Sequence, residues 1–469
     1  MIYMGKKTNE NVEAVLSILK DAQIDYSPLN YYYTPITPYP RSITPKAKEP
    51  LNVDLSDFQV MVYIHIPFCS RKCTFCPFFL DVNQKVPEVF VSALKKQIRQ
   101  TYTNFQLPSK LNIYFGGGSP NLLSIDQLKE IIDCFKKEQI EEINIEIHPE
   151  VYKNNKEYFA EISKLGINRV SIGLQSTEVE ILKNSTRGHD ALTLKKIIPE
   201  IKKNNLLVNV DVMFGGLFGE IIDYTKNTFE YAFGELKPDW ITAYQVCIHG
   251  GTAEKNRYEK NIEKYPDTKT ILEMRAIRQK IAQKNGYKYL FGDYFSAEHL
   301  NPKYKTKRWS LKTAVIGLGP GAHSYIIDQK QKFGFNWYSS FNVEEYLNLV
   351  NSNKYPTERL TKLNKEHIDS WRIISQLKSS GFVEKADSNV ILSKLSKLNL
   401  LTQENNLFKL TERGVLIEDL IYAVLIPLEM WSKLSTKKKD KNYSPEDAKY
   451  DWFFDPDVVI QFKKYLNSL

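Results

Sequence analysis

Hydrophobic positions follow two alternating periods between residues 60 and 246. Short apolar, β-branched runs predict six strands, at 60–66, 111–115, 143–147, 169–174, 208–214 and 240–246. The segments between them have the period of amphipathic helices, as in 124–135, where Ser124 and Gln127 form a capping-box pattern. Six strand–helix units predict an α/β fold with a parallel sheet. Because a closed barrel needs eight units, we expect an open, partial (β/α)6 barrel.

The pattern changes on both sides of this region and predicts three parts. Residues 1–58 combine a helical stretch at 12–22 with a proline- and tyrosine-rich arm, whose prolines favour extended chain. Residues 59–355 form the expected α/β domain. Residues 356–469 contain helical runs, a short turn and a further helical run, which predict a winged-helix-like C-terminal domain followed by a tail that we do not assign.

Composition and charge restrict the class of protein. None of the apolar runs in the 469 residues reaches the ~20 residues of a membrane helix, and the N-terminus lacks the features of a signal peptide. We therefore expect a cytoplasmic protein with no membrane contact, and the absence of a nucleic-acid-binding motif predicts no nucleic-acid partner. The net charge of +9 is most simply a solvated surface, although it would also attract an anionic substrate.

The strongest chemical signal is a cysteine cluster directly after the first predicted strand. Three of the five cysteines, Cys69, Cys73 and Cys76, lie within this short segment. Structural zinc takes four protein ligands, and neither a Cys nor a His nearby completes such a set, so a zinc site is the less favoured alternative. Three thiolates suit a 4Fe–4S cluster with one iron open to a substrate or cofactor.

The motif C-x3-C-x2-C after the first strand of a six-fold β/α array resembles that of the radical S-adenosylmethionine (SAM) superfamily. The surrounding YIHIPFC is similar to the oxygen-independent coproporphyrinogen oxidase group, which also contains heme chaperones, anaerobilin synthases and class C methyltransferases. The resemblance runs from about Val60 to Leu425. It implies a catalytic domain in which SAM chelates the open iron and is cleaved to a 5′-deoxyadenosyl radical.

The resemblance also implies SAM contacts near the first three strands. Phe75 corresponds to a residue near the adenine, with loop packing as the alternative. Gly116, Gly117 and Gly118 correspond to the stretch that meets the SAM amino group, since glycines let backbone N–H groups approach a ligand. Glu146 corresponds to the glutamate that holds this amino group, which would offset the cost of burying a carboxylate. A structural salt bridge is the alternative for Glu146.

Further contacts are implied after the later strands. Gln175 and Asp211 correspond to residues that bind the ribose, and Arg187 corresponds to the partner of the SAM carboxylate, a bidentate match for guanidinium. The chain reads GGLFGE where the family has Gly-Leu-Pro-Gly, so the geometry of the loop after Asp211 stays open. Gly319 and Ala322 lie in a glycine-rich stretch that in the family closes the domain near a second SAM or the substrate.

Three residues are candidates for substrate contact or catalysis. Tyr63 corresponds to the tyrosine beside a second SAM, and the alternative is a packed strand aromatic. Cys247 and His249 follow the sixth strand at the expected barrel mouth. The alternative for Cys247 is a buried small side chain.

The resemblance leaves four functions open. The first, favoured by CTFCPFF, is a tetrapyrrole enzyme of the anaerobilin-synthase-like branch, in which a second SAM donates a methylene group to heme. The second is the oxidative decarboxylation of coproporphyrinogen III. The third is a non-enzymatic heme chaperone, and the fourth is a class C methyltransferase acting on a heteroaromatic natural product. An enzyme of this kind implies a flavodoxin- or ferredoxin-type electron donor.

Overall fold

The computed structural model describes residues 6–27, 52–78, 80–82, 85–189, 191–249, 251–300, 310, 312–384, 390–405, 407–439 and 455–469. The expected proline- and tyrosine-rich arm lies outside the described residues, except for its flanks. The centre of the molecule is a 12-stranded sheet in the order β11-β12-β10-β9-β8-β7-β6-β2-β13-β14-β15-β16. The end strands, β11 and β16, do not pair with each other in the described part of the chain, so the sheet is open.

The six predicted strands form the middle of this sheet, and each runs parallel to its neighbour. They are β2 (Gln59–Ile66), β6 (Leu111–Gly117), β7 (Ile140–Ile147), β8 (Arg169–Gln175), β9 (Leu207–Phe214) and β10 (Trp240–Gln245). The prediction of an α/β fold with an open parallel sheet is therefore confirmed.

Strands that the hydrophobic pattern did not predict extend the sheet at both ends. β13 (Lys312–Leu318) is parallel to β2, and β14 (His323–Asp328), β15 (Phe333–Ser339) and β16 (Thr357–Leu363) follow as antiparallel strands. At the other end β12 (Tyr294–Ala297) is antiparallel to β10 and pairs with β11 (Tyr287–Phe291). The sheet thus reaches Leu363, and the domain limits 1–58, 59–355 and 356–469 remain predictions.

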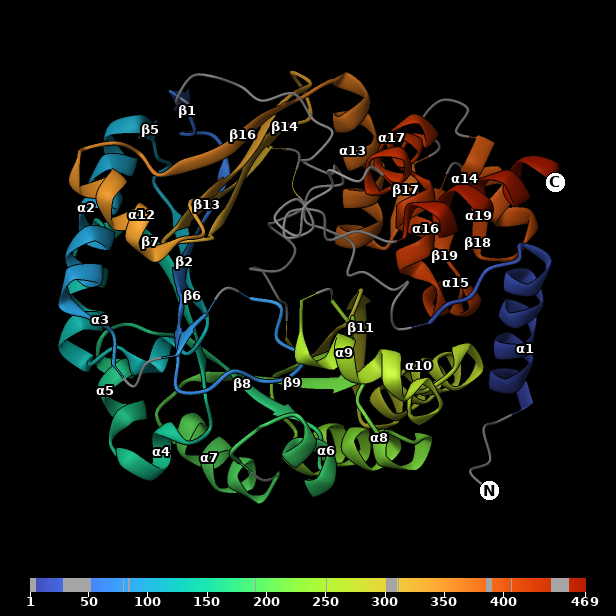
Figure 1. Cartoon of the computed structure of the whole chain (residues 1–469), viewed down its shortest axis with the longest axis horizontal. Helices are drawn as coiled ribbons and strands as arrows, with labels where there is room; N and C mark the ends of the chain where they lie inside the picture. Colours follow the sequence, from blue (N-terminus) through green and yellow to red (C-terminus); the bar gives the residue numbers. More distant parts are fainter. Residues whose placement is uncertain are drawn as a thin grey trace.

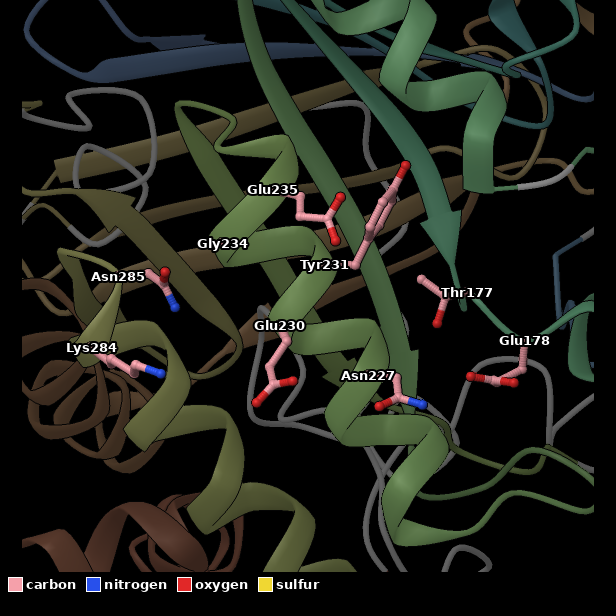
Figure 2. Close-up of a pocket in the computed structure, with 9 residues that line it drawn as sticks. All are labelled: Thr177, Glu178, Asn227, Glu230, Tyr231, Gly234, Glu235, Lys284 and Asn285. Carbon is pink, nitrogen blue, oxygen red and sulfur yellow. The ribbon is translucent and has the colours of Figure 1, made fainter. Parts of the chain in front are cut away.

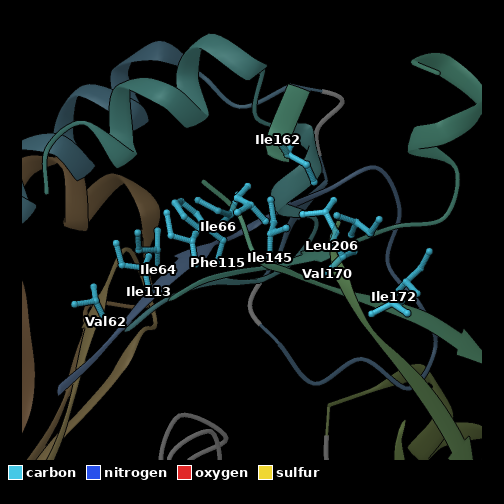
Figure 3. Close-up of a cluster of buried hydrophobic side chains, with 14 of the residues drawn as sticks. Val62, Ile64, Ile66, Ile113, Phe115, Ile145, Ile162, Val170, Ile172 and Leu206 are labelled. Carbon is cyan, nitrogen blue, oxygen red and sulfur yellow. The ribbon is translucent and has the colours of Figure 1, made fainter. Parts of the chain in front are cut away.

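Helices cover the outer face of the parallel strands, where side chains such as Ile64, Ile113 and Val170 pack beneath them in one core (Figure 3). The predicted capping box is present, because Ser124 Oγ accepts from Gln127 N at 3.1 Å and Gln127 Oε1 accepts from Ser124 N at 3.1 Å. The helices are α2 (Glu88–Asn104), α3 (Ile125–Ile132), α4 (Val151–Asn154), α5 (Tyr158–Lys164), α6 (Val179–Asn184), α7 (Ala191–Lys203), α8 (Ile222–Phe229), the π-helical η4 (Glu230–Leu236), α9 (Ala253–Lys260), α10 (Thr268–Lys284) and α12 (Val343–Asn351).

The C-terminal part is a helical body with a small antiparallel sheet in the order β17-β19-β18. The N-terminal helix α1 (Lys6–Asp21) packs against α10 and α15, so it lies beside the C-terminal part of the chain (Figure 1). The elements are α13 (Lys365–Ser380), β17 (Phe382–Glu384), α14 (Val390–Lys397), β18 (Leu401–Glu404), β19 (Leu407–Leu410), α15 (Glu412–Leu416), α16 (Glu418–Val424), α17 (Leu428–Lys438) and α19 (Pro456–Ser468). Within the described residues, every helix is too short or too polar to cross a membrane.

Candidate functional site

The two faces of the parallel sheet differ in chemistry because side chains alternate along each strand. Val62 and Ile64 of β2 belong to the aliphatic core under the helices, whereas Tyr63 lies between them on the opposite, inner face. Tyr63 pairs in register with Tyr114 of β6, and their rings lie 6.1 Å apart. The inner face therefore carries the polar and aromatic side chains of the candidate site.

The three motif cysteines lie on the loop that leaves β2, and all three are half-buried free thiols. Cys69 Sγ lies 3.1 Å from Ser119 Oγ, and the N–H of Cys76 donates to the carbonyl of Cys73 at 3.2 Å. Burial, and to a smaller extent the nearby Cys73 and Cys69, raise the pKa of the Cys76 thiol to about 11. Thiols in such a site become thiolates when a metal binds them.

The donor set of this loop fits an iron–sulfur cluster. No three His, Cys, Asp or Glu side chains in the described ranges are grouped as ligands of a single metal ion. A 4Fe–4S cluster would instead be held by three separate thiolates, which Cys69, Cys73 and Cys76 would supply. Arg187 Nη1 lies 3.8 Å from Cys73 Sγ, and its buried Nε has no hydrogen-bond partner among the described residues. The Arg187 guanidinium therefore has an N–H beside the thiols that could bind an anionic ligand group.

The glycine stretch that ends β6 packs closely against the cysteine loop and its neighbours. A Cβ at Gly116 would lie 2.9 Å from the Tyr63 ring and 3.1 Å from Glu146 Oε1. Gly117 has φ +109°, which favours glycine, and a Cβ at Gly118 would lie 2.3 Å from the carbonyl oxygen of Phe68. Side chains at these positions would displace the cysteine loop or its neighbours.

Glu146 is the central carboxylate of the inner face. Its Oε1 accepts from Tyr114 OH at 2.9 Å and its Oε2 accepts from Gly117 N at 3.2 Å. Desolvation and then the charge of Asp211 raise the pKa of Glu146 to about 7, although the hydrogen bonds from Tyr114 and Gly117 lower it. The described residues form no ion pair with Glu146. The structural salt bridge considered for this residue is therefore absent from the described part of the chain.

Asp211 lies across from Glu146 on β9. Its carboxylate accepts from Ser171 Oγ at 2.9 Å and from Asn209 Nδ2 at 2.8 Å. Gln175 ends β8 with φ +66°, where the pairing with β9 shifts register. This irregularity at the end of a strand is typical of strands that turn a side chain toward a site.

Tyr244 of β10 lies near the polar groups of several strands and near the cysteine loop. Its hydroxyl donates to Gln175 Oε1 at 3.5 Å. Its pKa is raised first by desolvation and then by Asp211, while Arg187 lowers it, and Glu146 and Cys76 act on it as well. The structure thus gathers the cysteine loop, Arg187, Gln175, Glu146 and Asp211 in one neighbourhood.

The loop after Asp211, whose geometry the sequence left open, is closed by a buried carboxyl group instead of a proline. Glu220 accepts backbone N–H bonds from Gly215 at 2.8 Å, Gly216 at 3.3 Å and Leu217 at 3.2 Å. Its other oxygen accepts from Thr225 Oγ1 at 2.6 Å. Desolvation raises the pKa of Glu220 to about 7.

The glycine-rich stretch after β13 lies directly beside β2. Gly317 pairs with Tyr63, and Gly319 has φ +94° with its position for a Cβ 2.3 Å from the carbonyl oxygen of His65. Ala322 is fully buried. Tyr63 OH lies 3.2 Å from His65 Nδ1, so Tyr63, His65 and this stretch form one border of the inner face.

The remaining predicted residues are less tightly connected to the site. Phe75 is half-buried against a separate hydrophobic cluster that includes Met213 and Val246. Cys247 packs at the edge of the core shared with the C-terminal part. The carbonyl of His249 accepts from Thr252 Oγ1 at 2.7 Å, and desolvation lowers the pKa of His249 to about 4.

Four polar residues of the site were missed from the sequence: Tyr114, Ser171, Asn209 and Tyr244. Tyr114 precedes Gly116 by two positions, and Asn209 precedes Asp211 by two, so strand alternation could have found both. The role of Ser171 and Tyr244 depends on which strands are neighbours, which the sequence alone did not give.

A pocket of about 670 Å³ lies elsewhere, along α8 and η4 and near the end of α10 (Figure 2). It is lined by Thr177, Glu178, Asn227, Glu230, Tyr231, Gly234, Glu235, Lys284 and Asn285. None of these is a predicted site residue, so this pocket is separate from the candidate site.

Comparison with known proteins gives a consistent family relationship. Residues 63–232 match the model of the radical SAM superfamily. The chain is 27% identical to the heme chaperone HemW of Buchnera aphidicola over 334 residues, which cover 70% of this chain and 86% of the relative. It is 25% identical to HemW of Bacillus subtilis over 388 residues, covering 78% and 98% of the two chains.

A solved structure of similar fold is coproporphyrinogen III oxidase (HemN) from Escherichia coli, described as a radical SAM enzyme. The TM-score is 0.67 with 18% sequence identity, and the match covers 81% of this chain and 91% of the other. At this identity the likeness establishes the fold.

Proposed function

We propose that this chain, which belongs to the radical SAM superfamily and to its oxygen-independent coproporphyrinogen oxidase-like group, cleaves SAM with a 4Fe–4S cluster held by Cys69, Cys73 and Cys76. When bound and reduced, the cluster supplies the electron that breaks a carbon–sulfur bond of SAM, giving methionine and a 5′-deoxyadenosyl radical. The observation that carries the proposal is Glu146, a carboxylate without an ion-pair partner in the described chain, beside glycines and a loop of three free thiols.

The proposed SAM contacts follow from the charges of this neighbourhood. Glu146 accepts hydrogen bonds from the SAM amino group, with the Gly116–Gly118 stretch against it. Arg187, whose Nε is buried without a partner, binds the SAM carboxylate. Asp211 and Gln175 bind the ribose, and Phe75 lies near the adenine.

The proposed substrate is a tetrapyrrole, and heme is the first candidate. Support comes from the names of the HemW relatives and from the aromatic inner face, where Tyr63 and Tyr114 offer rings to a planar macrocycle. In this proposal a second SAM binds beside Tyr63, near Gly319 and Ala322. Bound there, this SAM would supply a one-carbon group to an sp2 carbon of the macrocycle and leave as S-adenosylhomocysteine, while the first SAM would give 5′-deoxyadenosine.

The proposed enzyme also needs an electron donor, and two other radical SAM reactions remain as alternatives. A flavodoxin- or ferredoxin-type protein supplies the electron, and Cys247 and His249 remain candidates for substrate contact. A class C methyltransferase on a heteroaromatic compound would use the same two SAM molecules, and a coproporphyrinogen dehydrogenase would use the same radical on a propionate side chain.

A heme chaperone is the second candidate function. It is favoured by the relatives, because both HemW chains match over most of their length. A chaperone would bind heme and release it unchanged.

One experiment separates these functions. Anaerobically reconstituted protein is incubated with methyl-deuterated SAM, a reductant and, in separate reactions, heme or coproporphyrinogen III, and the products are measured by mass spectrometry. The first proposal predicts about four irons per chain, deuterium in 5′-deoxyadenosine and an enlarged tetrapyrrole. The Cys73→Ala variant should lose the iron and the products. Heme recovered unchanged with no SAM cleavage decides for the chaperone, and deuterium-free 5′-deoxyadenosine with a decarboxylated porphyrinogen decides for the dehydrogenase.

A further inference from the structure

The cysteine loop is attached to a helix that is distant in the sequence. Thr74, between Cys73 and Phe75, donates from its Oγ1 to Glu254 Oε2 at 2.6 Å. The carbonyl of Thr74 accepts from the N–H of Glu254 at 3.1 Å. Two hydrogen bonds, one from a side chain and one from the backbone, thus join the loop to the first turn of α9.

Glu254 is held in place on its other side. It is 1% exposed, and its Oε1 accepts from Tyr265 OH at 2.6 Å. Arg257 Nη1 lies 3.6 Å from Glu254 Oε2 and also donates to the carbonyl of Asn184 at 3.0 Å. Because each carboxylate oxygen already has a partner, the direction of the acceptor toward Thr74 is fixed before the loop reaches it.

Other contacts of the loop are longer. Arg71 Nη2 lies 3.0 Å from Glu150 Oε2, and Cys69 Sγ lies 3.1 Å from Ser119 Oγ. Two more contacts use the backbone of the loop. Thr74 N donates to the carbonyl of Ser185 at 3.4 Å, and Thr186 Oγ1 donates to the carbonyl of Lys72 at 3.1 Å. The hydrogen bond to a buried carboxylate is shorter than any of these, as expected when the acceptor is charged. Unlike Arg71 and Glu150, whose side chains are partly exposed, Glu254 is buried, so this bond is shielded from solvent.

We propose that Thr74 and Glu254 form a clasp that fixes the cysteine loop in the conformation that receives the cluster. They are positioning residues, since they act on the cluster only through the loop. The role as a cluster loop rests on the proposed function, whereas the ordering of the loop by the clasp does not.

A valine has the shape of threonine but no hydroxyl, so Thr74→Val removes the side-chain bond alone. Thr74→Ser keeps the hydroxyl and serves as the rescue. Thr361→Val is the matched control, because Thr361 is also a threonine whose Oγ1 donates, at 3.1 Å, to the carbonyl of Asn336 in a part of the sheet away from the loop.

Two measurements test the clasp. The first is hydrogen exchange of the loop peptide in the iron-free full-length chain, and the second is the rate at which a chelator removes iron from the loaded protein. We expect Thr74→Val to exchange and to lose iron about tenfold faster, consistent with the loss of one charge-assisted bond. Thr74→Ser and Thr361→Val should stay within about twofold of the parent chain in both measurements.

The outcomes distinguish a failure of the proposed function from a failure of the clasp. If the parent chain takes up no iron, the proposed function fails, and the exchange measurement still decides about the clasp. If Thr74→Val exchanges like the parent chain, or if Thr74→Ser exchanges as fast as Thr74→Val, the clasp is wrong whatever the iron content.

Discussion

Two clusters of ionisable side chains inside this molecule balance their charges in opposite ways. Where α10 meets α16 and β12, Arg275 Nη2 lies 2.8 Å from Asp419 Oδ2, and Arg278 Nη1 lies 2.7 Å from Asp293 Oδ1. On the inner face of the sheet, Glu146 of β7 and Asp211 of β9 are two strands apart, and desolvation and then the charge of Asp211 raise the pKa of Glu146. The first cluster neutralises Asp419 and Asp293 with its own arginines, whereas Glu146 in the second has no ion-pair partner among the described residues, so its negative charge is in surplus.

The difference separates a structural cluster from a binding cluster. Self-neutralised ion pairs need no further partner, and losing one member leaves the other charge buried. A carboxylate with a pKa raised to about 7 is costly to keep ionised until a donor arrives, which is typical of binding sites. Glu418 in the first cluster also has a pKa raised to about 7, by desolvation and then by Asp419, but Tyr289, Tyr422 and Gly292 all donate to it.

The largest effect should come from breaking the self-neutralised cluster. Asp419→Ala would leave Arg275 buried without its carboxylate, so we expect the free energy of unfolding to fall by about 3–5 kcal/mol, measured by chemical denaturation. The exposed pair Lys195–Glu235 is the control, and Glu235→Ala should cost less than about 1 kcal/mol. Equal losses in the two variants would contradict the contrast.

Removing a carboxylate from the inner-face cluster should not lower the free energy of unfolding. Glu146→Gln removes surplus negative charge, so we expect no loss of unfolding free energy at pH 8 and a gain of at most about 1 kcal/mol, since the side chain keeps some contact with solvent. SAM binding should weaken by about tenfold or more, as measured by equilibrium dialysis on cluster-loaded protein, because a charged acceptor is lost. A variant as unstable as Asp419→Ala would show that Glu146 is structural.

The pH dependence of SAM binding should follow the same carboxylate. The pKa of Glu146 in the folded chain, about 7, exceeds its ordinary value of 4.5, so the folded state favours the proton and this contribution to stability is lost as pH rises through about 7. SAM binding needs the ionised form, so affinity should increase several-fold from pH 6 to pH 8. The same titration of Glu146→Gln isolates any titration of SAM itself, and a parallel increase in that variant would remove Glu146 as the cause.

The residues of the inner-face cluster could largely be predicted from the sequence, whereas those of the ion-paired cluster could not. Local alternation gave the six strands and placed Glu146 and Asp211 on them, and the spacing of Cys69, Cys73 and Cys76 singled out the loop. The partners of these residues depend on register between strands, as for Ser171 beside Asp211. The pair Arg275–Asp419 joins residues far apart in the chain, and no local pattern encodes such a contact. β13 was missed as a strand for the same reason, because its neighbour β2 precedes it by some 250 residues.

We expect the smallest effect from removing the Tyr114 hydroxyl, which influences the pKa of Glu146. Tyr114 OH donates to Glu146 Oε1 at 2.9 Å and lowers the pKa of that carboxyl group, although desolvation outweighs it. Tyr114→Phe should therefore raise the pKa of Glu146 further, so that at pH 7 less of the ionised form is present and SAM binds about two- to threefold more weakly. At pH 9 Glu146 is ionised in both proteins, and the difference in affinity should nearly disappear. If Tyr114 instead contacts SAM directly, the loss will be the same at pH 7 and pH 9, and the contrast between the two clusters will need a second group besides Glu146 to explain the binding of SAM.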